Sequence, residues 1–221
     1  MKKRVMVYGD SNSWGYLSDG LGIRCPDRWP VVMARLLNVE LIEECLPGRT
    51  TVHDDPEFMG DIMNGLRHLP VALKSHSPLD TLIIMLGTND LKSRFNPSAE
   101  KIAKNIGKLI DCAIKTGAGQ SNWEDTTPPN IYVVVPPKLP EYVNDPQWER
   151  CEEWKGGYSA SLSLFAAVQA NTSSNAIPIF DAGSVIAGAV DDPIHWTQAS
   201  HKILGETIAN WIASLEKLRD K

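Results

Sequence analysis

The sequence lacks the features that mark nucleic-acid-binding and membrane-spanning proteins. It has 22 lysines and arginines against 27 aspartates and glutamates, and this formal net charge of -5 offers no basic surface of the kind that nucleic acids require. No apolar run approaches the roughly 20 residues of a membrane-spanning helix. We therefore expect neither nucleic acid nor membrane among its partners. The first apolar run, residues 5–8, is too short for a signal-peptide core, so the expected location is the cytoplasm.

Cysteine is scarce, and metal-binding patterns are missing. The four cysteines lie far apart and form no C-x-x-C pair: Cys25, Cys45, Cys112 and Cys151. This is not the spacing of a zinc site, and we expect free thiols rather than disulfides. The histidines outside the candidate site have no metal-binding spacing with a carboxylate and are expected at the surface: His53, His68, His76 and His201. We expect neither a metal nor an organic cofactor.

Strand-like and helix-like segments alternate along the whole chain. Strand-like segments occupy residues 4–8, 39–43, 81–86, 131–135 and 177–180. Amphipathic helices are predicted over residues 27–37, 61–74, 97–115, 152–170 and 197–218. Pro70 should kink or break the second helix, and Gly156 and Gly157 interrupt the fourth. The alternation predicts a single α/β domain over residues 1–221, in which a five-stranded parallel sheet carries helices on both faces.

A serine follows the first predicted strand. In such a sheet ligands bind outside the carboxyl ends of the strands, and Gly9-Asp10-Ser11 places Ser11 there, beside backbone N–H groups that favour negative charge. Ser11 is either a nucleophile or an ordinary turn or N-cap serine, and this segment alone does not decide. A phosphate loop is excluded, since neither G-x-x-x-x-G-K-[ST] nor G-x-G-x-x-G is present. The G-x-S-x-G nucleophile elbow is absent as well.

A histidine and two aspartates follow the last predicted strand. Asp192 precedes His195 by three residues, a spacing at which the carboxylate can hold the imidazole in one tautomer and leave the other ring nitrogen free to act as a base. Asp191 is the alternative carboxylate, and the spacing favours Asp192. Taken alone, the segment fits a turn followed by a surface histidine better.

Two further segments offer hydrogen-bond donors at the same edge. Asn89 follows the third strand, where its amide can donate to a developing oxyanion, and Gly48 follows the second, where its backbone can approach a ligand closely. An ordinary loop asparagine and a plain turn glycine are the alternatives. Together, however, the four segments supply a nucleophile, a base, an orienting acid and oxyanion donors, which is the set that acyl transfer requires.

The same residues resemble the conserved blocks of the SGNH (GDSL-type) hydrolase family. They are Gly9-Asp10-Ser11, Gly48, Gly87-Thr88-Asn89-Asp90 and Asp192-x-x-His195, and the likeness is greatest to the small bacterial arylesterase and acyltransferase branch. The resemblance implies a flavodoxin-like three-layer sandwich. It also implies Ser11 as nucleophile, His195 as base and Asp192 as its partner, with an oxyanion hole made of the Ser11 N–H, the Gly48 N–H and the Asn89 side chain.

The resemblance also suggests how the substrate is held. Trp14 and Ile194 would wall the acyl pocket, although a core or surface role for Trp14 is equally consistent with the sequence. Asn12 departs from the family, which commonly has Leu at this position, and so puts substrate preference in doubt. The long segment 138–150, with Trp148, would either cover the site or pack against another subunit, and we expect a homo-oligomer.

The predicted activity is hydrolysis of short-chain acyl esters, aryl esters included, with transfer of the acyl group to alcohols as a further outcome. A carbohydrate O-deacetylase or a thioesterase with the same three residues is the alternative within the enzymes. A flavodoxin-like module that binds a nucleotide or flavin is an alternative of another class, and it would need the phosphate loop that is missing after the first strand. A catalytically inactive interaction protein is disfavoured because every catalytic position is filled.

Overall fold

A computed structural model describes residues 1–119, 123–124, 126–172 and 176–219 of the chain. Its centre is a sheet of five parallel strands in the order β2-β1-β3-β4-β5. The strands are β1 (Arg4–Gly9), β2 (Glu40–Cys45), β3 (Thr81–Met85), β4 (Asn130–Val135) and β5 (Ile179–Asp181). The predicted five-stranded parallel sheet is thus confirmed, with strand ends shifted by one or two residues.

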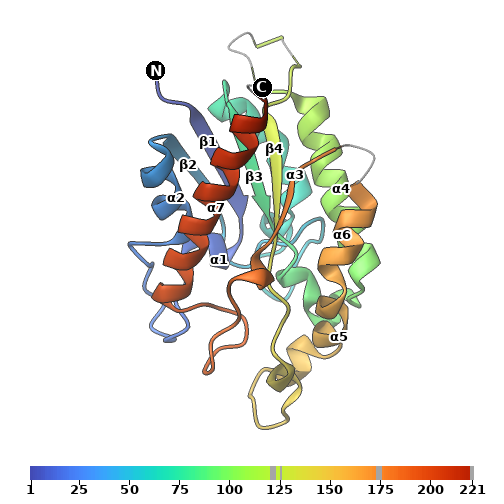
Figure 1. Cartoon of the computed structure of the whole chain (residues 1–221). Coiled ribbons are helices and arrows are strands. Elements are labelled where there is room, and N and C mark those ends of the chain that lie inside the picture. The colour runs from blue at the N-terminus through green and yellow to red at the C-terminus, as the bar shows by residue number, and fades with distance from the viewer. Residues whose placement is uncertain (120–122, 125, 173–175, 220–221) are drawn as a thin grey trace.

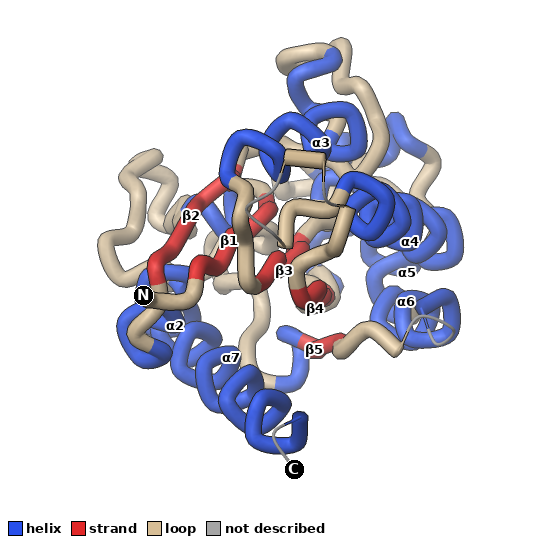
Figure 2. Tube along the Cα trace, turned by 90° about the horizontal axis from the view of Figure 1, so that it is seen from above, coloured by secondary structure: helices blue, strands red, loops and turns tan. Residues whose placement is uncertain are grey.

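Helices cover both faces of the sheet, as predicted for a three-layer sandwich (Figure 1; Figure 2). One face packs against α2 (Trp29–Leu37) and α7 (Gln198–Arg219). The other packs against α3 (Gly65–His76), α4 (Ala99–Thr116), α5 (Gly157–Leu162) and α6 (Leu164–Thr172). Among the described residues, no helix is both long and apolar enough to cross a membrane.

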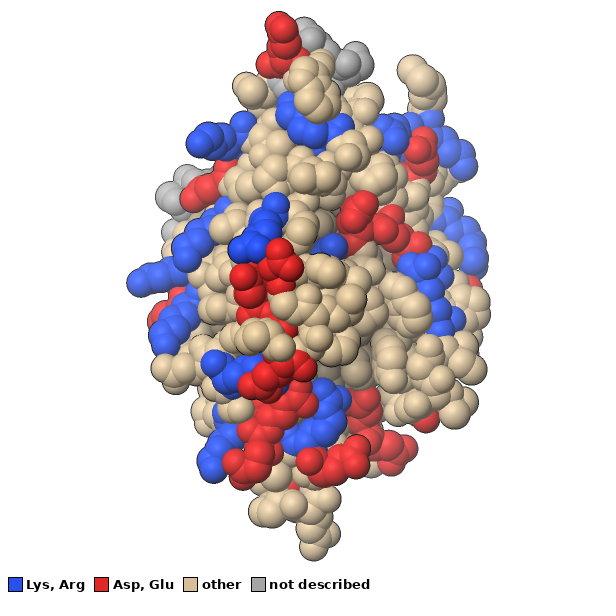
Figure 3. Space-filling model, turned by 180° about the vertical axis from the view of Figure 1, so that it is seen from behind, with Lys and Arg blue, Asp and Glu red and all other residues tan. Residues whose placement is uncertain are grey.

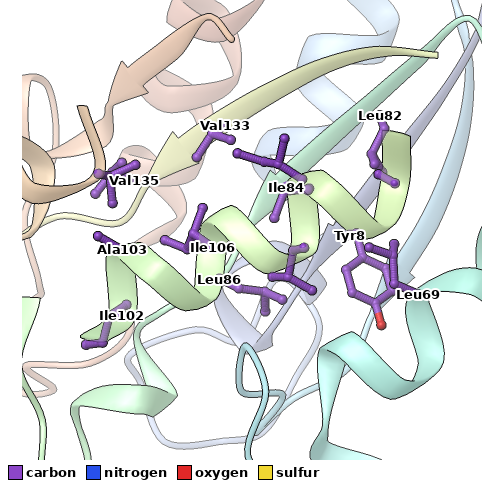
Figure 4. Packing of buried hydrophobic residues seen from close by; sticks show 14 of the residues in the cluster. Tyr8, Leu69, Leu82, Ile84, Leu86, Ile102, Ala103, Ile106, Val133 and Val135 are labelled. Atoms are coloured by element: carbon purple, nitrogen blue, oxygen red, sulfur yellow. The ribbon is translucent and has the colours of Figure 1, made fainter. Parts of the chain in front are cut away.

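The two cores follow from the alternation of side chains along each strand. Val5 and Val7 of β1 belong to the core under α2 and α7, whereas Met6 and Tyr8 belong to the opposite core. Figure 4 shows the second core, where Ala103 and Ile106 of α4 lie beside Val133 and Val135 of β4. Because both faces are covered, the central strands read as continuous apolar runs.

Two predicted helices differ from the structure. Pro70 does not break α3, which continues to His76. As the sixth residue of the helix, Pro70 removes only the hydrogen bond to the carbonyl of Leu66. The helix residues Leu69 and Leu73 stay buried. The single helix predicted over residues 152–170 is instead a 3-10 turn (Cys151–Trp154) followed by α5 and α6. Gly156 precedes α5 in a left-handed conformation with φ of 83°, which ends regular helix there.

One surface expectation is wrong. His53, His68 and His76 are partly exposed, but His201 is fully buried in the first turns of α7. Its ring lies 5.4 Å from the ring of Trp196, and burial lowers the pKa of His201 to about 4. The four cysteines are free thiols.

Candidate active site

The register of the sheet brings the first three strand ends to one level. Gly9, the last residue of β1, pairs with Cys45 of β2 on one side and with Met85 of β3 on the other. The segments that carry Ser11, Gly48 and Asn89 therefore leave the sheet at the same edge, as the sequence predicts.

Ser11 is the first residue of the short helix α1 (Ser11–Trp14), immediately after β1. Asp10 caps this helix, because its carboxylate accepts the backbone N–H of Asn12 at 3.0 Å. The turn has no room for a side chain at Gly9, where a Cβ atom would lie 2.3 Å from the hydroxyl of Ser13. The strand thus passes directly into the helix and leaves Ser11 at the edge of the sheet.

His195 lies between Ser11 and Asp192. Its Nε2 is 3.1 Å from the Ser11 hydroxyl, and its Nδ1 is 2.6 Å from Asp192 Oδ2. The other oxygen of Asp192 accepts the backbone N–H groups of Ile194 at 2.8 Å and of His195 at 3.2 Å. The aspartate therefore fixes both the ring and the backbone that carries it, and it is the carboxylate that the three-residue spacing favours over Asp191.

The ionisation of Asp192 suits this arrangement. Burial alone would raise its pKa, but the hydrogen bond and charge of His195 and the two backbone N–H groups outweigh that effect, so the pKa of Asp192 lies below its ordinary value. An ionised Asp192 accepts from His195 Nδ1 and leaves Nε2 to face the Ser11 hydroxyl.

Gly48 and Asn89 lie beside Ser11. Gly48 adopts a φ of +90°, a conformation that favours glycine. The Asn89 amide donates to the carbonyl of Arg49 at 3.1 Å and keeps its second N–H proton for another acceptor. Asp90 joins the same two loops, because its carboxylate accepts the backbone N–H of Thr51 at 2.9 Å and the Thr51 hydroxyl.

A cavity of about 800 Å³ opens over these groups. This volume is in the range of small-molecule sites. Ser11, His195, Gly48 and Asn89 are part of its lining. The apolar and aromatic part of the lining consists of Tyr16, Pro47, Phe58, Trp154 and Ile194. The charged and polar part consists of Glu57, Lys92, Ser93, Arg94, Arg150, Glu152 and Glu153. Within the described residues, no group of three or more His, Cys, Asp and Glu side chains could hold a metal ion.

Of the two residues predicted to wall the cavity, Ile194 lies in its lining and Trp14 does not. Trp14 instead packs beneath Arg24, whose guanidinium lies 5.2 Å from the indole, and lies 6.4 Å from the ring of Tyr16. Tyr16 takes the place expected for Trp14, with its ring 4.4 Å from the imidazole of His195. Sequence spacing did not predict the position of Tyr16, because α1 is only one helical turn long and the chain changes direction at Gly15.

Asn12 is a packing contact rather than part of the cavity lining. It is buried, and its amide donates to the carbonyl of Ile194 at 3.1 Å. The polar residue at this position therefore ties the nucleophile's helix to the loop that carries His195.

Several lining residues were not foreseen from the sequence. Phe58 belongs to the loop after Gly48, and Lys92 and Arg94 follow Asn89. Arg150 closes the predicted loop 138–150 and lines the cavity, whereas Trp148 of the same loop packs against the hydrophobic core. The position of Lys92 and Arg94 directly after a predicted strand-end motif is the one sequence signal that could have indicated them.

Comparison with known proteins agrees with this geometry. The model of the GDSL-like lipase/acylhydrolase family matches residues 7–203. The native aryl esterase of M. smegmatis is 35% identical with a TM-score of 0.83, over 96% of this chain and 99% of that one. A carbohydrate acetylesterase from Sinorhizobium meliloti is 34% identical with a TM-score of 0.83, over 97% of this chain and 100% of that one. Another carbohydrate acetylesterase family member from that organism is 31% identical with a TM-score of 0.86, over 95% and 97% of the two chains.

A search among curated proteins found no match. The family match spans most of the chain, and the solved structures align with nearly all of it. The resemblance to SGNH (GDSL-type) hydrolases is thereby confirmed: the chain belongs to the GDSL-like lipase/acylhydrolase family and is a carboxylic ester hydrolase.

Proposed function

We propose that the chain hydrolyses short-chain acyl esters, aryl esters included, through a covalent acyl group on Ser11. The observation that carries this proposal is the continuous hydrogen-bonded line from Asp192 through His195 to the Ser11 hydroxyl. It opens into a cavity that also contains the two proposed oxyanion donors, Gly48 and Asn89.

In the first half-reaction Ser11 Oγ attacks the ester carbonyl carbon, and His195 Nε2 takes the hydroxyl proton. The carbonyl oxygen becomes an oxyanion, which accepts hydrogen bonds from the backbone N–H groups of Ser11 and Gly48 and from the Asn89 amide. The intermediate then expels the alcohol, which receives the proton from His195. Asp192 stabilises the imidazolium throughout and does not itself take the proton.

In the second half-reaction water attacks the acyl-enzyme. His195 takes the proton from the water, the oxyanion forms at the same donors, and collapse releases the carboxylic acid and restores the Ser11 hydroxyl. An alcohol in place of water would yield a new ester. The ratio of acid to new ester, measured at several alcohol concentrations, tests the proposed transfer activity, and acid alone at high alcohol would contradict it.

We propose acetyl to butyryl esters as the best substrates. Ile194 and the rings of Tyr16, Phe58 and Trp154 make up most of the apolar lining, and bulky side chains of this kind in an acyl site would favour short acyl groups. Activity on esters whose acyl chains have two to twelve carbons measures this preference directly.

The test of the proposed nucleophile is Ser11→Ala. The variant should fold normally and lose about 10⁴-fold or more in kcat/KM on an aryl acetate, because the covalent route is removed. Circular dichroism and thermal unfolding serve as the folding control. A fully active Ser11→Ala variant would contradict the assignment.

Deacetylation of a carbohydrate is the second candidate. The charged lining residues favour it, since Glu57, Arg150 and Glu152 can exchange hydrogen bonds with sugar hydroxyl groups. Two of the similar solved structures are described as carbohydrate acetylesterases. Comparing kcat/KM for acetylated sugars and for aryl acetates separates the two candidates: a higher value for the sugars would favour deacetylation.

A further inference from the structure

Phe58 stands on a tight turn at the cavity of Ser11. The turn is closed by Asp55 and Gly60, whose backbone groups exchange hydrogen bonds of 2.9 and 2.7 Å, and the Phe58 N–H donates to the Asp55 carbonyl at 3.0 Å. Although Phe58 lines the cavity, its side chain is 58% exposed. The hydrogen-bonded turn therefore holds an aromatic ring at the border between cavity and solvent.

The ring of Phe58 lies against Gly48. A Cβ atom at Gly48 would lie 2.8 Å from Phe58 Cε1 and 2.9 Å from the sulfur of Met63, closer than side chains tolerate. Gly48 thus lets the ring rest directly on the backbone that provides a proposed oxyanion donor.

Buried charges anchor the turn that carries Phe58. Asp55 is fully buried, and its Oδ2 accepts Lys92 Nζ at 3.3 Å and Arg94 Nη2 at 2.9 Å. Arg94 also donates to Oε2 of Glu57 at 2.7 Å, and Glu57 lies two residues after Asp55 on the same turn. Burial opposes ionisation of Asp55, yet Arg94 and Lys92 hold the pKa of this carboxyl below its ordinary value. The turn is fixed on the loop that follows Asn89.

The reaction determines which part of the cavity each group of the bound ester must face. Four groups surround the reacting carbon: Ser11 Oγ, the oxyanion, the leaving oxygen and the acyl chain. The leaving oxygen must face His195 Nε2, which protonates it, and the oxyanion must face Gly48 and Asn89. The acyl chain takes the remaining direction, which points away from His195 Nε2. The Phe58 ring is part of the cavity lining and lies against Gly48 rather than beside His195, whose neighbouring ring is that of Tyr16.

We propose that Phe58 sets the upper limit of acyl-chain length, because its ring closes the cavity on the acyl side next to Gly48. This inference rests on the proposed esterase function. Tyr16 lies where Trp14 was expected, beside His195, and the proposal gives the limit on acyl length to Phe58 instead.

The test compares wild type, Phe58→Ala and the matched control Met59→Ala on two substrate series. Met59 is on the same turn and 46% exposed, but is not part of the cavity lining. One series is p-nitrophenyl esters with acyl chains from acetyl to dodecanoyl, and the other is acetates of alcohols of increasing length. In Phe58→Ala the octanoyl-to-acetyl ratio of kcat/KM should rise about tenfold or more, since each methylene newly buried contributes roughly fourfold at about 0.8 kcal/mol.

The acetate series should keep its wild-type profile in Phe58→Ala, and Met59→Ala should match wild type on both series. An unchanged acyl profile in Phe58→Ala, or a shift in the acetate series alone, overturns the proposal. A change in subunit number on sedimentation of Phe58→Ala would also overturn it, because it would place the ring in a contact between copies. If wild type hydrolyses no ester of either series, the proposed function fails instead.

Discussion

Asp191 and Asp192 are neighbours in the chain, but only Asp192 bonds His195. Asp192→Asn should lower kcat on an aryl acetate by up to about 10⁴-fold, because the amide favours the wrong imidazole tautomer. Asp191 is exposed, and Asp191→Asn is the matched control with an expected effect within about twofold. Steady-state kinetics of the two variants decide the assignment, and a larger loss in Asp191→Asn would reverse it.

Asn89 has one amide proton on the Arg49 carbonyl and the other available to the substrate. Asn89→Ala should lower kcat by roughly 10²- to 10³-fold with KM little changed, because the donor acts mainly in the transition state. Thermal unfolding should accompany the kinetics, since the variant also loses the bond to Arg49. An unchanged kcat would leave Asn89 a purely structural loop residue.

His201 makes stability depend on pH. Its folded-state pKa of about 4 lies below the ordinary value of 6.5. Between these two pH values the unfolded chain therefore binds more protons than the folded chain. The contribution of His201 to stability is thus lost as the pH falls from 6.5 to about 4. Between pH 7 and pH 4.5, the unfolding free energy of wild type should fall by roughly 2 kcal/mol more than that of His201→Asn.

Urea titrations of both proteins at the two pH values measure this difference. The comparison between proteins is necessary because burial raises the pKa of Asp10 to about 7, which acts on stability with the opposite sign and is common to both. Equal losses in wild type and His201→Asn would contradict the burial of a neutral imidazole.

The candidate site was largely predictable because its chemistry follows strand ends. A parallel sheet gathers the residues after its strands at one edge, so Ser11, Gly48, Asn89 and His195 could be placed together from order alone. Which aromatic ring reaches the cavity depends on the path of loops after a one-turn helix. Sequence spacing cannot fix that path, and Tyr16 rather than Trp14 lies there.

At the scale of elements, errors arose where tertiary contacts override local preference. A proline predicts a helix break, yet α3 continues through Pro70 because its buried leucines hold it against the sheet. The burial of His201 has a similar origin, because the sequence of a predicted helix does not reveal that the ring of Trp196 will pack against this histidine.

Arg94 joins separate elements of the cavity wall. It contacts Asp55 and Glu57 on one turn and Glu153 in the 3-10 turn (Cys151–Trp154). Arg94→Ala should lower the unfolding free energy by about 2 kcal/mol, because it removes one of the two cationic partners of the buried Asp55 carboxylate and leaves only Lys92. Arg67→Ala is the control: it removes a similar guanidinium from Asp54 and Asp61, where the arginine side chain is 49% exposed.

The control should cost about 1 kcal/mol or less, since exposed ion pairs contribute little. Chemical denaturation of both variants gives the comparison, and equal losses would contradict a structural role for the Arg94 cluster.

For the molecule as a whole, the sequence pattern predicted the layers and the number of strands, whereas the partners expected from its charge pattern stay predictions. Figure 3 shows Lys and Arg side chains interspersed with a band of Asp and Glu on the face seen from behind, rather than a continuous basic area. The homo-oligomer and the cytoplasmic location stay predictions.

Every step of the proposed reaction depends on a covalent intermediate at Ser11. Treatment of the whole chain with a fluorophosphonate, followed by mapping of the modified residue by mass spectrometry, identifies the nucleophile, with His195→Ala as the comparison. We expect one label, on Ser11, and strongly slowed labelling in His195→Ala because the base at 3.1 Å is lost. A label on another serine, or equal labelling rates in the two proteins, would contradict it.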